Sequence, residues 1–274
     1  MSNRSTVRVA AIQMHCCADL GRNFRAADEL LAEAGRRGVQ LALLPENSFF
    51  IGANDEDKLG VAEQPGKGPI HDFLADAAVR HGLWLVAGSI PVQSAISGKC
   101  FGTSVAYDDQ GRLMASYRKI HLFDVDLPEG AGHYCESATM THGDDTVTLD
   151  TPAGRIGLTI CYDLRFPELY RRLVDAGATV FTVPAAFTAV TGEAHWESLL
   201  RARAIENLAY VIAAGQYGVH DNGRRSYGCS MIIDPWGKVL ARQAEGCGVV
   251  DALLDTRRAE TLRKEFPVLT HRRL

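Results

Sequence analysis

One stretch, residues 155–173, constrains this chain most, because an apolar strand pattern, a cysteine and a helix start follow one another there. Residues 156–160 (I-G-L-T-I) are typical of a short buried strand. Pro167 occupies the kind of position where a helix begins, and Glu168 puts a negative charge at the positive end of that helix. Cys161 therefore leaves the end of a strand just before a helix starts, which is where an α/β protein would hold a nucleophile.

The environment expected for Cys161 also favours a reactive thiol. Backbone N–H groups are unpaired at a helix start and the local potential is positive, so we expect this turn to favour thiolate over thiol. Free cysteine is also among the most buried residue types, so a structural role in the core stays open. The polar residues Asp163 and Arg165 support the nucleophile, and the rest of the chain has to decide.

Composition excludes several classes of protein. A chain of 274 residues with 46% hydrophobic residues can bury a sizeable core, and its net charge of −4 offers no electrostatic footprint for nucleic acid or an anionic membrane. No apolar run approaches the roughly 18 residues that a membrane helix needs, and the polar first six residues show no secretory signal. Seven cysteines without zinc-type spacing indicate a reduced, cytoplasmic protein without a disulfide framework.

Strand and helix patterns alternate along the chain and are interrupted by two turn-rich hairpins. Helices are expected over residues 24–37, 70–81, 167–175 and 195–208, and strands over 7–14, 39–44, 83–92, 101–107, 112–117, 147–149, 156–160, 179–183, 210–216, 226–233 and 238–241. The tail from residue 255 onward is charged and is expected to wrap a surface. This order predicts an α/β protein with one mixed sheet or two sheets and helices outside, and residues 1–274 as a single domain.

Two further polar residues stand at strand ends. Glu46 follows the apolar residues 41–45, where a carboxylate is costly unless it is paired or functional, although an exposed loop position stays possible. Lys119 ends another strand pattern, where most lysines are simply solvated. Beside Cys161, a carboxylate could deprotonate the thiol and later a water, and an ammonium could stabilise the oxyanion. Spacing alone does not exclude a histidine base instead, from among His121, His133 and His195.

The segments around these residues resemble the nitrilase superfamily of carbon–nitrogen hydrolases. The matching blocks are L-L-P-E-N around Glu46, Y-R-K-I-H-L-F-D around Lys119 and G-L-T-I-C-Y-D-L-R-F-P-E-L around Cys161. Further blocks extend the resemblance over essentially the whole chain, at residues 194–207, 226–237 and 266–273. They look closest to the branch that contains deaminated glutathione amidase, whose sister branch is ω-amidase. Cys229 departs from that branch, which has His in the S-Y-G-H-S block.

This resemblance implies a fold and a set of site residues. The fold is a four-layer α-β-β-α sandwich, and the catalytic triad is Glu46, Lys119 and Cys161, with Glu136 positioning the lysine and the substrate. Cys161 attacks an amide carbonyl, the oxyanion is held by Lys119 and the backbone N–H of Tyr162, and a thioester forms. Neither a metal nor an organic cofactor is expected, because the triad needs no Lewis acid.

The substrate implied is a small amide that carries a carboxylate. Arg165 is the best candidate to bind that carboxylate bidentately, although a salt bridge to Asp163 or Glu168 is the alternative. The resemblance suggests that Phe187 and Thr191 line the pocket. The reaction expected is amide hydrolysis with release of ammonia. Among the activities of this family, that of a deaminated glutathione amidase is expected first. The alternatives are an ω-amidase acting on α-ketoglutaramate, an N-carbamoyl-amine hydrolase, and a catalytically idle binding scaffold.

Assembly and thiol reactivity complete the expectations. The resemblance implies a homodimer, or a larger even-numbered oligomer, that meets through the helices after Cys161 and over residues 195–208. Trp196 and Leu200 could equally serve the core of their own chain. Alkylating reagents are expected to label Cys161 first, with Cys16 and Cys17 as the strongest competitors.

Overall fold

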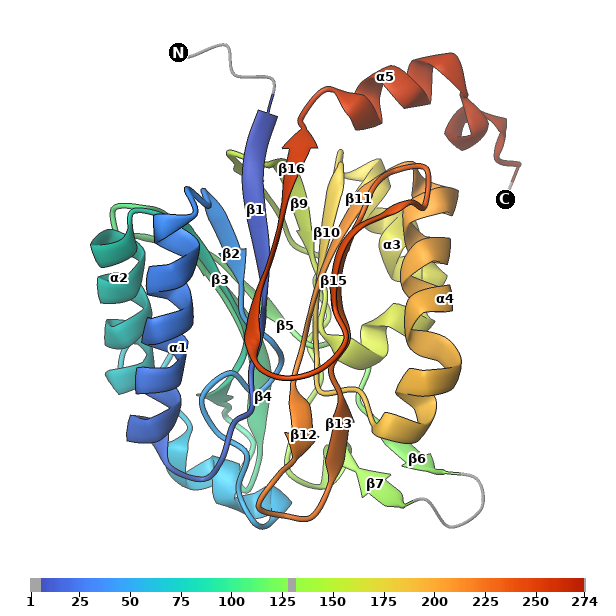
Figure 1. The fold of residues 1–274 in the computed structure, drawn as a ribbon. Coiled ribbons are helices and arrows are strands. Elements are labelled where there is room, and N and C mark those ends of the chain that lie inside the picture. The colour runs from blue at the N-terminus through green and yellow to red at the C-terminus, as the bar shows by residue number, and fades with distance from the viewer. Residues whose placement is uncertain (1–5, 128–131, 274) are drawn as a thin grey trace.

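Two six-stranded sheets form the centre of the computed structural model, which describes residues 6–127 and 132–273 (Figure 1). In spatial order the first sheet contains β16 (Gly248–Asp255), β1 (Thr6–Gln13), β2 (Leu41–Leu43), β3 (Trp84–Gln93), β4 (Cys100–Tyr107) and β5 (Leu113–Arg118). The second contains β15 (Val239–Gln243), β14 (Ser230–Ile233), β11 (Tyr210–Gly215), β10 (Val180–Ala185), β9 (Gly154–Leu158) and β8 (Thr148–Thr151).

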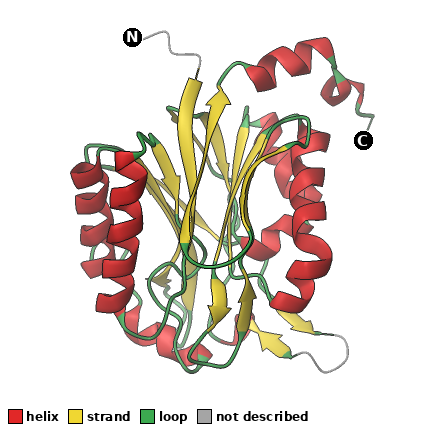
Figure 2. Ribbon diagram, viewed as in Figure 1, coloured by secondary structure: helices red, strands yellow, loops and turns green. Residues whose placement is uncertain are grey.

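Helices cover the outer face of each sheet, so the layers run α-β-β-α as expected (Figure 2). The helices are α1 (Leu20–Arg36) and α2 (Pro69–His81) on the first sheet, α3 (Pro167–Asp175) and α4 (Ala189–Asn207) on the second, and the C-terminal α5 (Arg258–Glu265). Side chains from both sheets share one core between them, for example Val9 and Leu43 from the first and Ile156 from the second. No helix in the described ranges combines the length and apolarity needed to cross a bilayer.

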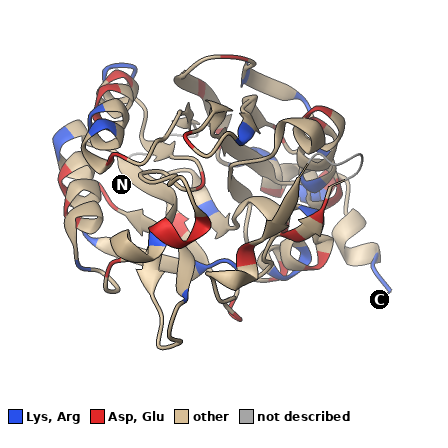
Figure 3. Cartoon of the chain, turned by 90° about the horizontal axis from the view of Figure 1, so that it is seen from below, with Lys and Arg blue, Asp and Glu red and all other residues tan. Residues whose placement is uncertain are grey.

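Short elements gather at one end of the sandwich. These are the hairpins β6 (Asp124–Asp126) with β7 (His133–Cys135) and β12 (Tyr217–Val219) with β13 (Arg225–Tyr227), and the 3₁₀ turns η1 (Asp55–Val61), η3 (Glu136–Ala138) and η4 (Cys161–Arg165). A further 3₁₀ turn, η5 (Val268–His271), follows α5. Seen from the hairpin end, charges of both signs are interspersed, and neither sign covers the face (Figure 3).

Strand direction explains why this end can hold a site. Strands β1, β2 and β3 are parallel, as are β9, β10 and β11. A parallel bridge between Met14 and Gln216 continues β1 and β11, so both sheets direct their carboxyl ends to the same edge. In open α/β sheets, ligands bind just outside that edge.

Three of the differences from the sequence prediction bear on the site or on the sheet that carries it. Helix α4 begins at Ala189 rather than at residue 195, because the Thr188 hydroxyl caps its first turn. The expected strand 226–233 is interrupted where Gly228 and Cys229 adopt left-handed φ values of 73° and 55°. The segment before residue 255 forms β16, which pairs with β1 over eight positions, and the tail beyond it contains α5.

Candidate active site

The predicted triad residues converge because each follows a strand that ends at the same edge. Glu46 comes three residues after β2, Lys119 directly follows β5, and Cys161 follows β9 as the first residue of η4. Cys161 has a φ of 46°, a left-handed backbone that few non-glycine residues adopt. Such strain persists only where the surrounding structure enforces it, and it is concentrated at functional sites.

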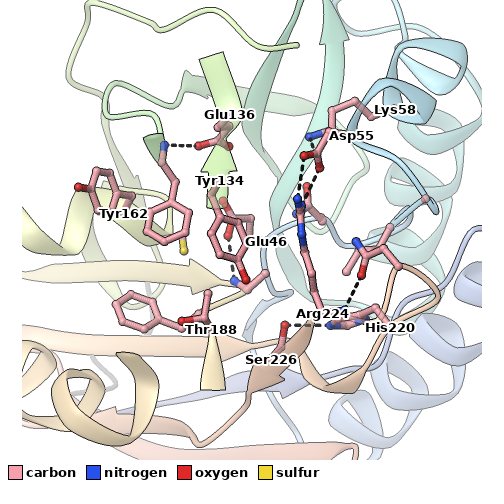
Figure 4. Close-up of a pocket in the computed structure, with 18 of the residues that line it drawn as sticks. Glu46, Asp55, Lys58, Tyr134, Glu136, Tyr162, Thr188, His220, Arg224 and Ser226 are labelled. Atoms are coloured by element: carbon pink, nitrogen blue, oxygen red, sulfur yellow. Dashed lines mark hydrogen bonds and ion pairs between the residues drawn. The ribbon is translucent and has the colours of Figure 1, made fainter. Parts of the chain in front are cut away.

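A buried ammonium held by two carboxylates forms the centre of the site (Figure 4). Lys119 Nζ donates to Glu46 Oε1 at 2.8 Å and to both oxygens of Glu136, at 2.9 and 2.8 Å. The remaining oxygen of Glu46 accepts from the N–H of Ala186 at 2.8 Å, and Glu136 accepts from the N–H of Phe123 at 2.7 Å. Glu136 therefore holds Lys119 at a buried position. The resemblance had implied that Glu136 positions this lysine.

Electrostatics keeps this cluster ionised. Burial opposes ionisation of Glu46, but the Lys119 ammonium outweighs it and holds the pKa of Glu46 below its usual value. Burial would also lower the pKa of Lys119, but Glu136 and Glu46 raise it well above its usual value. A lysine 2% exposed and a glutamate 5% exposed are thus charged together, which is how buried charges are tolerated.

The buried thiol of Cys161 lies beside the Glu46 carboxylate, whose charge affects its ionisation. Burial and the Glu46 charge raise the pKa of Cys161 well above its usual value, and the Lys119 ammonium offsets only part of this. The expectation that the turn favours a thiolate is therefore wrong for the free protein. Its local N–H groups are outweighed by a carboxylate from another strand, so the thiol is protonated and a base stands next to it.

Asp163 ties the cysteine turn to the lysine segment. Its fully buried carboxylate accepts from the N–H of Ile160 at 2.8 Å and from the Tyr117 hydroxyl at 2.7 Å. It also accepts from the N–H of His121 at 3.1 Å and lies 2.7 Å from Nδ1 of that ring. Because His121 follows Lys119 by two residues, this carboxylate sets the position of Cys161 relative to the lysine.

The other residues expected at the site line one pocket with the triad. These are Tyr162, Arg165, Phe187 and Thr191. Tyr162 is the second residue of η4, where N–H groups precede the first intrahelical bond. Phe187 and Thr191 lie at the start of α4 rather than in a long loop.

Arg165 is free to bind an anion. In the described part of the chain no carboxylate lies within ion-pair distance of its guanidinium, so the alternative salt bridge to Asp163 or Glu168 does not form. Instead the guanidinium lies 5.2 Å from the ring centroid of Phe187 and 5.9 Å from that of Tyr162, and 3.3 Å from Nδ1 of His195.

The histidine bases considered from the sequence lie elsewhere. His121 is held by Asp163, His133 by Asp126, and His195 faces Arg165, and none of the three lines the pocket. Within residues 6–127 and 132–273, no group of three His, Cys, Asp or Glu side chains has the arrangement of a metal site.

Several pocket residues were missed by sequence reasoning. The lining also includes Asp55, Lys58, Phe123, Tyr134, Arg224 and Arg225. They come from η1, the β6–β7 hairpin and the β12–β13 hairpin. The adjacent arginines in G-R-R-S are a weak signal, since two arginines in a polar turn are ordinarily solvated.

The remaining cysteines also differ from expectation. Cys16 is fully buried, and burial raises its pKa to about 12, so it is a poor competitor for alkylation. Cys17 is 7% exposed, whereas Cys135 is exposed and lines the pocket. Cys229, at the position where the resembling branch has His, contributes its backbone carbonyl, which accepts from Trp196 Nε1 at 2.8 Å.

Comparison with known proteins identifies relatives over nearly the whole chain. The family model described as carbon-nitrogen hydrolase matches residues 8–264. The deaminated glutathione amidase of Yersinia enterocolitica is 42% identical over 266 residues, which cover 97% of this chain and 92% of that protein.

Solved structures agree over the whole fold. The NitFhit protein of C. elegans is 39% identical with a TM-score of 0.91, over 98% of this chain and 65% of that longer one. Nit3 of Saccharomyces cerevisiae, described as a member of branch 10 of the nitrilase superfamily, is 30% identical with a TM-score of 0.87 over 100% of both chains. The chain therefore belongs to the carbon–nitrogen hydrolase family of the nitrilase superfamily, as its sequence blocks predicted.

Proposed function

We propose that this protein hydrolyses an amide bond of a small carboxylate-bearing substrate through a thioester on Cys161. The observation that carries the proposal is the buried thiol of Cys161 beside the Glu46 carboxylate, which is itself held by Lys119 at 2.8 Å. A base next to a nucleophile and oriented by a third group is the arrangement that covalent catalysis needs.

The steps follow from this geometry. Glu46 takes the thiol proton as the sulfur attacks the amide carbonyl carbon, and the oxyanion is stabilised by Lys119 and the Tyr162 N–H. Protonated Glu46 then gives its proton to the leaving nitrogen as the carbon–nitrogen bond breaks, which leaves a thioester on Cys161. Glu46 next removes a proton from water, and hydrolysis of the thioester releases the acid and restores the thiol. Glu136 keeps Lys119 in place throughout.

The substrate proposed is deaminated glutathione, because relatives with that activity in their name match nearly the whole chain. A tripeptide that has lost its amino group retains no primary amide, so its leaving group is the amine of a dipeptide. Ammonia is released only from a primary amide such as α-ketoglutaramate, the substrate of the ω-amidase alternative. Both substrates share an α-keto carboxylate, and the unpaired Arg165 guanidinium suits that group.

A product analysis tests this function. Purified protein is incubated with deaminated glutathione, α-ketoglutaramate, glutamine, an N-carbamoyl amine and a simple nitrile, while dipeptide, ammonia and carbon dioxide are measured. We expect α-ketoglutarate and dipeptide from the first substrate and no turnover by Cys161→Ala, a loss of several orders of magnitude. Ammonia from α-ketoglutaramate alone would favour the ω-amidase, carbon dioxide the carbamoyl hydrolase, and inactivity on every substrate the idle scaffold.

Arg165→Lys tests the carboxylate site separately. Lysine keeps the charge but cannot form two parallel hydrogen bonds, so we expect the KM for carboxylate-bearing amides to rise about 10-fold. An unchanged KM would remove Arg165 from the proposal.

We also propose that the single domain of residues 1–274 assembles as a homodimer through α3 and α4. Trp196 and Leu200 are 0% exposed and serve the core of their own chain. Support comes instead from Ile205 on α4, which is 48% exposed and lies beside the loop of Trp236, and from Phe266, whose ring lies 5.7 Å from that of Trp236. Such exposed apolar neighbours are typical of an interaction surface.

Sedimentation of dilute protein tests the assembly, with Ile205→Glu as the disrupting variant and Val79→Glu, at an exposed position on α2, as its control. A fully active monomer of 29.8 kDa would refute coupling between assembly and activity. A cytoplasmic location is proposed as well, because all seven cysteines are free thiols and a reducing compartment keeps them so.

A further inference from the structure

Positive charge is in excess at the end of the pocket formed by η1 and the β12–β13 hairpin. Lys58, Arg224 and Arg225 line it, together with one carboxylate, that of Asp55. Arg224 donates to both oxygens of Asp55, at 2.8 and 3.0 Å, whereas Lys58 Nζ stays 4.0 Å from it, too far for a hydrogen bond. In the described ranges no carboxylate lies within ion-pair distance of Arg225. At this end of the pocket three cationic side chains are thus balanced by a single carboxylate.

A row of aromatic rings connects this end to Arg165. The Arg224 guanidinium lies 4.7 Å from the ring centroid of Tyr134, and that ring is 5.0 Å from Phe123. Phe123 is 5.0 Å from Tyr162, and the Arg165 guanidinium is 5.9 Å from Tyr162. The row therefore has a guanidinium at each end, and Figure 4 shows Tyr162 and Arg224 on opposite sides of Tyr134 in that view.

The reacting centre stands between these two cationic ends. Cys161 directly precedes Tyr162, and Glu136 follows Tyr134 by two residues. The aromatic row therefore passes beside the thiol and the Lys119–Glu136 ion pair. A substrate whose carbonyl reaches Cys161 while one carboxylate reaches Arg165 directs its leaving group toward the other end. A short leaving group such as ammonia does not reach there, but a dipeptide extends the substrate and ends in a second carboxylate.

We propose that Arg224, assisted by Lys58 and Arg225, binds the carboxylate of the leaving group and thereby selects long amides with a carboxylate at each end. This inference rests on the proposed function, because it assigns a site to the dipeptide part of that substrate. Asp55 neutralises only part of the positive charge at this end of the pocket and leaves the excess for the substrate. Arg224 is then a specificity-determining residue that separates dipeptide-releasing from ammonia-releasing activity.

The alternative role of Arg224 is structural, as a tie between η1 and the hairpin. Two variants separate the roles, because Arg224→Gln and Asp55→Asn break the same ion pair but change the local charge in opposite directions. A structural tie predicts the same loss for both variants on every substrate. An anion site predicts a loss for Arg224→Gln and no loss, or a lower KM, for Asp55→Asn.

The experiment measures kcat and KM for deaminated glutathione, for the same compound with its terminal carboxylate capped as an amide, and for α-ketoglutaramate. With Arg224→Gln we expect kcat/KM for the uncapped substrate to fall about 10- to 100-fold, mainly through KM, since a hydrogen-bonded charge contributes that much. α-Ketoglutaramate should change by less than about two-fold, and the capped substrate should lose nothing further. Arg80→Gln, which breaks the pair between Arg80 on α2 and Asp28 on α1, is the matched control.

Two kinds of failure are distinguishable. If the unmodified protein does not cleave deaminated glutathione, the proposed function fails, and the leaving-group site fails with it. If it does cleave that substrate but Arg224→Gln slows all three substrates equally, or both variants lose activity together, only the site is refuted.

Discussion

Asp163→Asn is the substitution whose consequences can be worked out most fully from the structure. The two carboxylate oxygens of Asp163 each face two donors, namely Ile160 N–H and the Tyr117 hydroxyl on one side, and the N–H and ring of His121 on the other. An asparagine keeps the shape but replaces one oxygen by an NH₂ group. Whichever way the amide turns, two donors then face a donor at a site that is 0% exposed.

The cost can be estimated from these contacts. Hydrogen bonds to a charged acceptor contribute about 1.5–3 kcal/mol each, so losing two of them should lower the free energy of unfolding by about 3–6 kcal/mol. The turn of Cys161 and the segment of Lys119 would also lose their common anchor. A displacement of about 1 Å in catalytic groups reduces the rate by about 100-fold, so kcat should fall by that order.

Urea unfolding and kcat measured on the same preparations test both numbers. Tyr117→Phe removes one of the four donors and should cost about 1.5–3 kcal/mol, half the loss expected for Asp163→Asn, which keeps the test informative if Asp163→Asn does not fold. Asp150→Asn, which breaks an exposed pair with Arg155, is the control and should leave the urea midpoint and kcat nearly unchanged. An Asp163→Asn protein within about 1 kcal/mol of wild type and with full kcat would refute the account of this turn.

Three further predictions concern the same site. The active form needs ionised Glu46, whose pKa is lowered from 4.5, and protonated Cys161, whose pKa is raised from 9.0. A plot of kcat/KM against pH should therefore stay flat from about pH 6 to 9. A change in kcat/KM near pH 6.5 would instead implicate a histidine. Gly88→Ala would press a methyl group against the carbonyls of Leu44 and Pro45 just before Glu46, so unfolding experiments should give a loss of about 1–3 kcal/mol with reduced kcat, and unchanged values would contradict this close approach. Substoichiometric iodoacetamide should label the exposed Cys135 before the protonated Cys161, as mass spectrometry of the free protein can check, and first labelling of Cys161 would indicate a thiolate.

The meeting of Glu46, Lys119 and Cys161 at one site was predictable from sequence, because each residue lies within a continuous, specific block. The positively charged end of the pocket, formed by Lys58, Arg224 and Arg225, was not predictable in the same way. Lys58 and Arg224 come from segments 166 positions apart, and each looks like an ordinary surface residue until the fold brings η1 against the β12–β13 hairpin. Similarly, β16 was missed because its partner is the first strand of the chain, and such non-local pairing leaves no mark in local periodicity.

The pKa of the cysteine illustrates the same limit on a smaller scale. Local sequence around Cys161 predicts a turn with a positive electrostatic potential at the start of a helix. The helix start is confirmed, since α3 begins at Pro167 as expected. What decides protonation is burial, together with the Glu46 carboxylate that follows β2. The protonation state of a side chain depends on the charges that tertiary structure brings within a few ångströms. Local sequence is enough to recognise Cys161 as a candidate nucleophile, but it does not reveal those charges.

The charge balance of the site explains why a protonated thiol suits this enzyme. Lys119 with Glu46 and Glu136 carries a net charge of −1, and ionising Cys161 in the free protein would add a second negative charge to a buried cluster. In the proposed mechanism, transfer of the thiol proton to Glu46 during attack takes the charge of these three side chains from −1 to 0. The new negative charge develops on the carbonyl oxygen beside Lys119 and the Tyr162 N–H, so the total charge of the site stays at −1. The nucleophile is thereby formed only when a carbonyl is present to accept the electrons, and the resting thiol stays in the form less open to oxidation and alkylation.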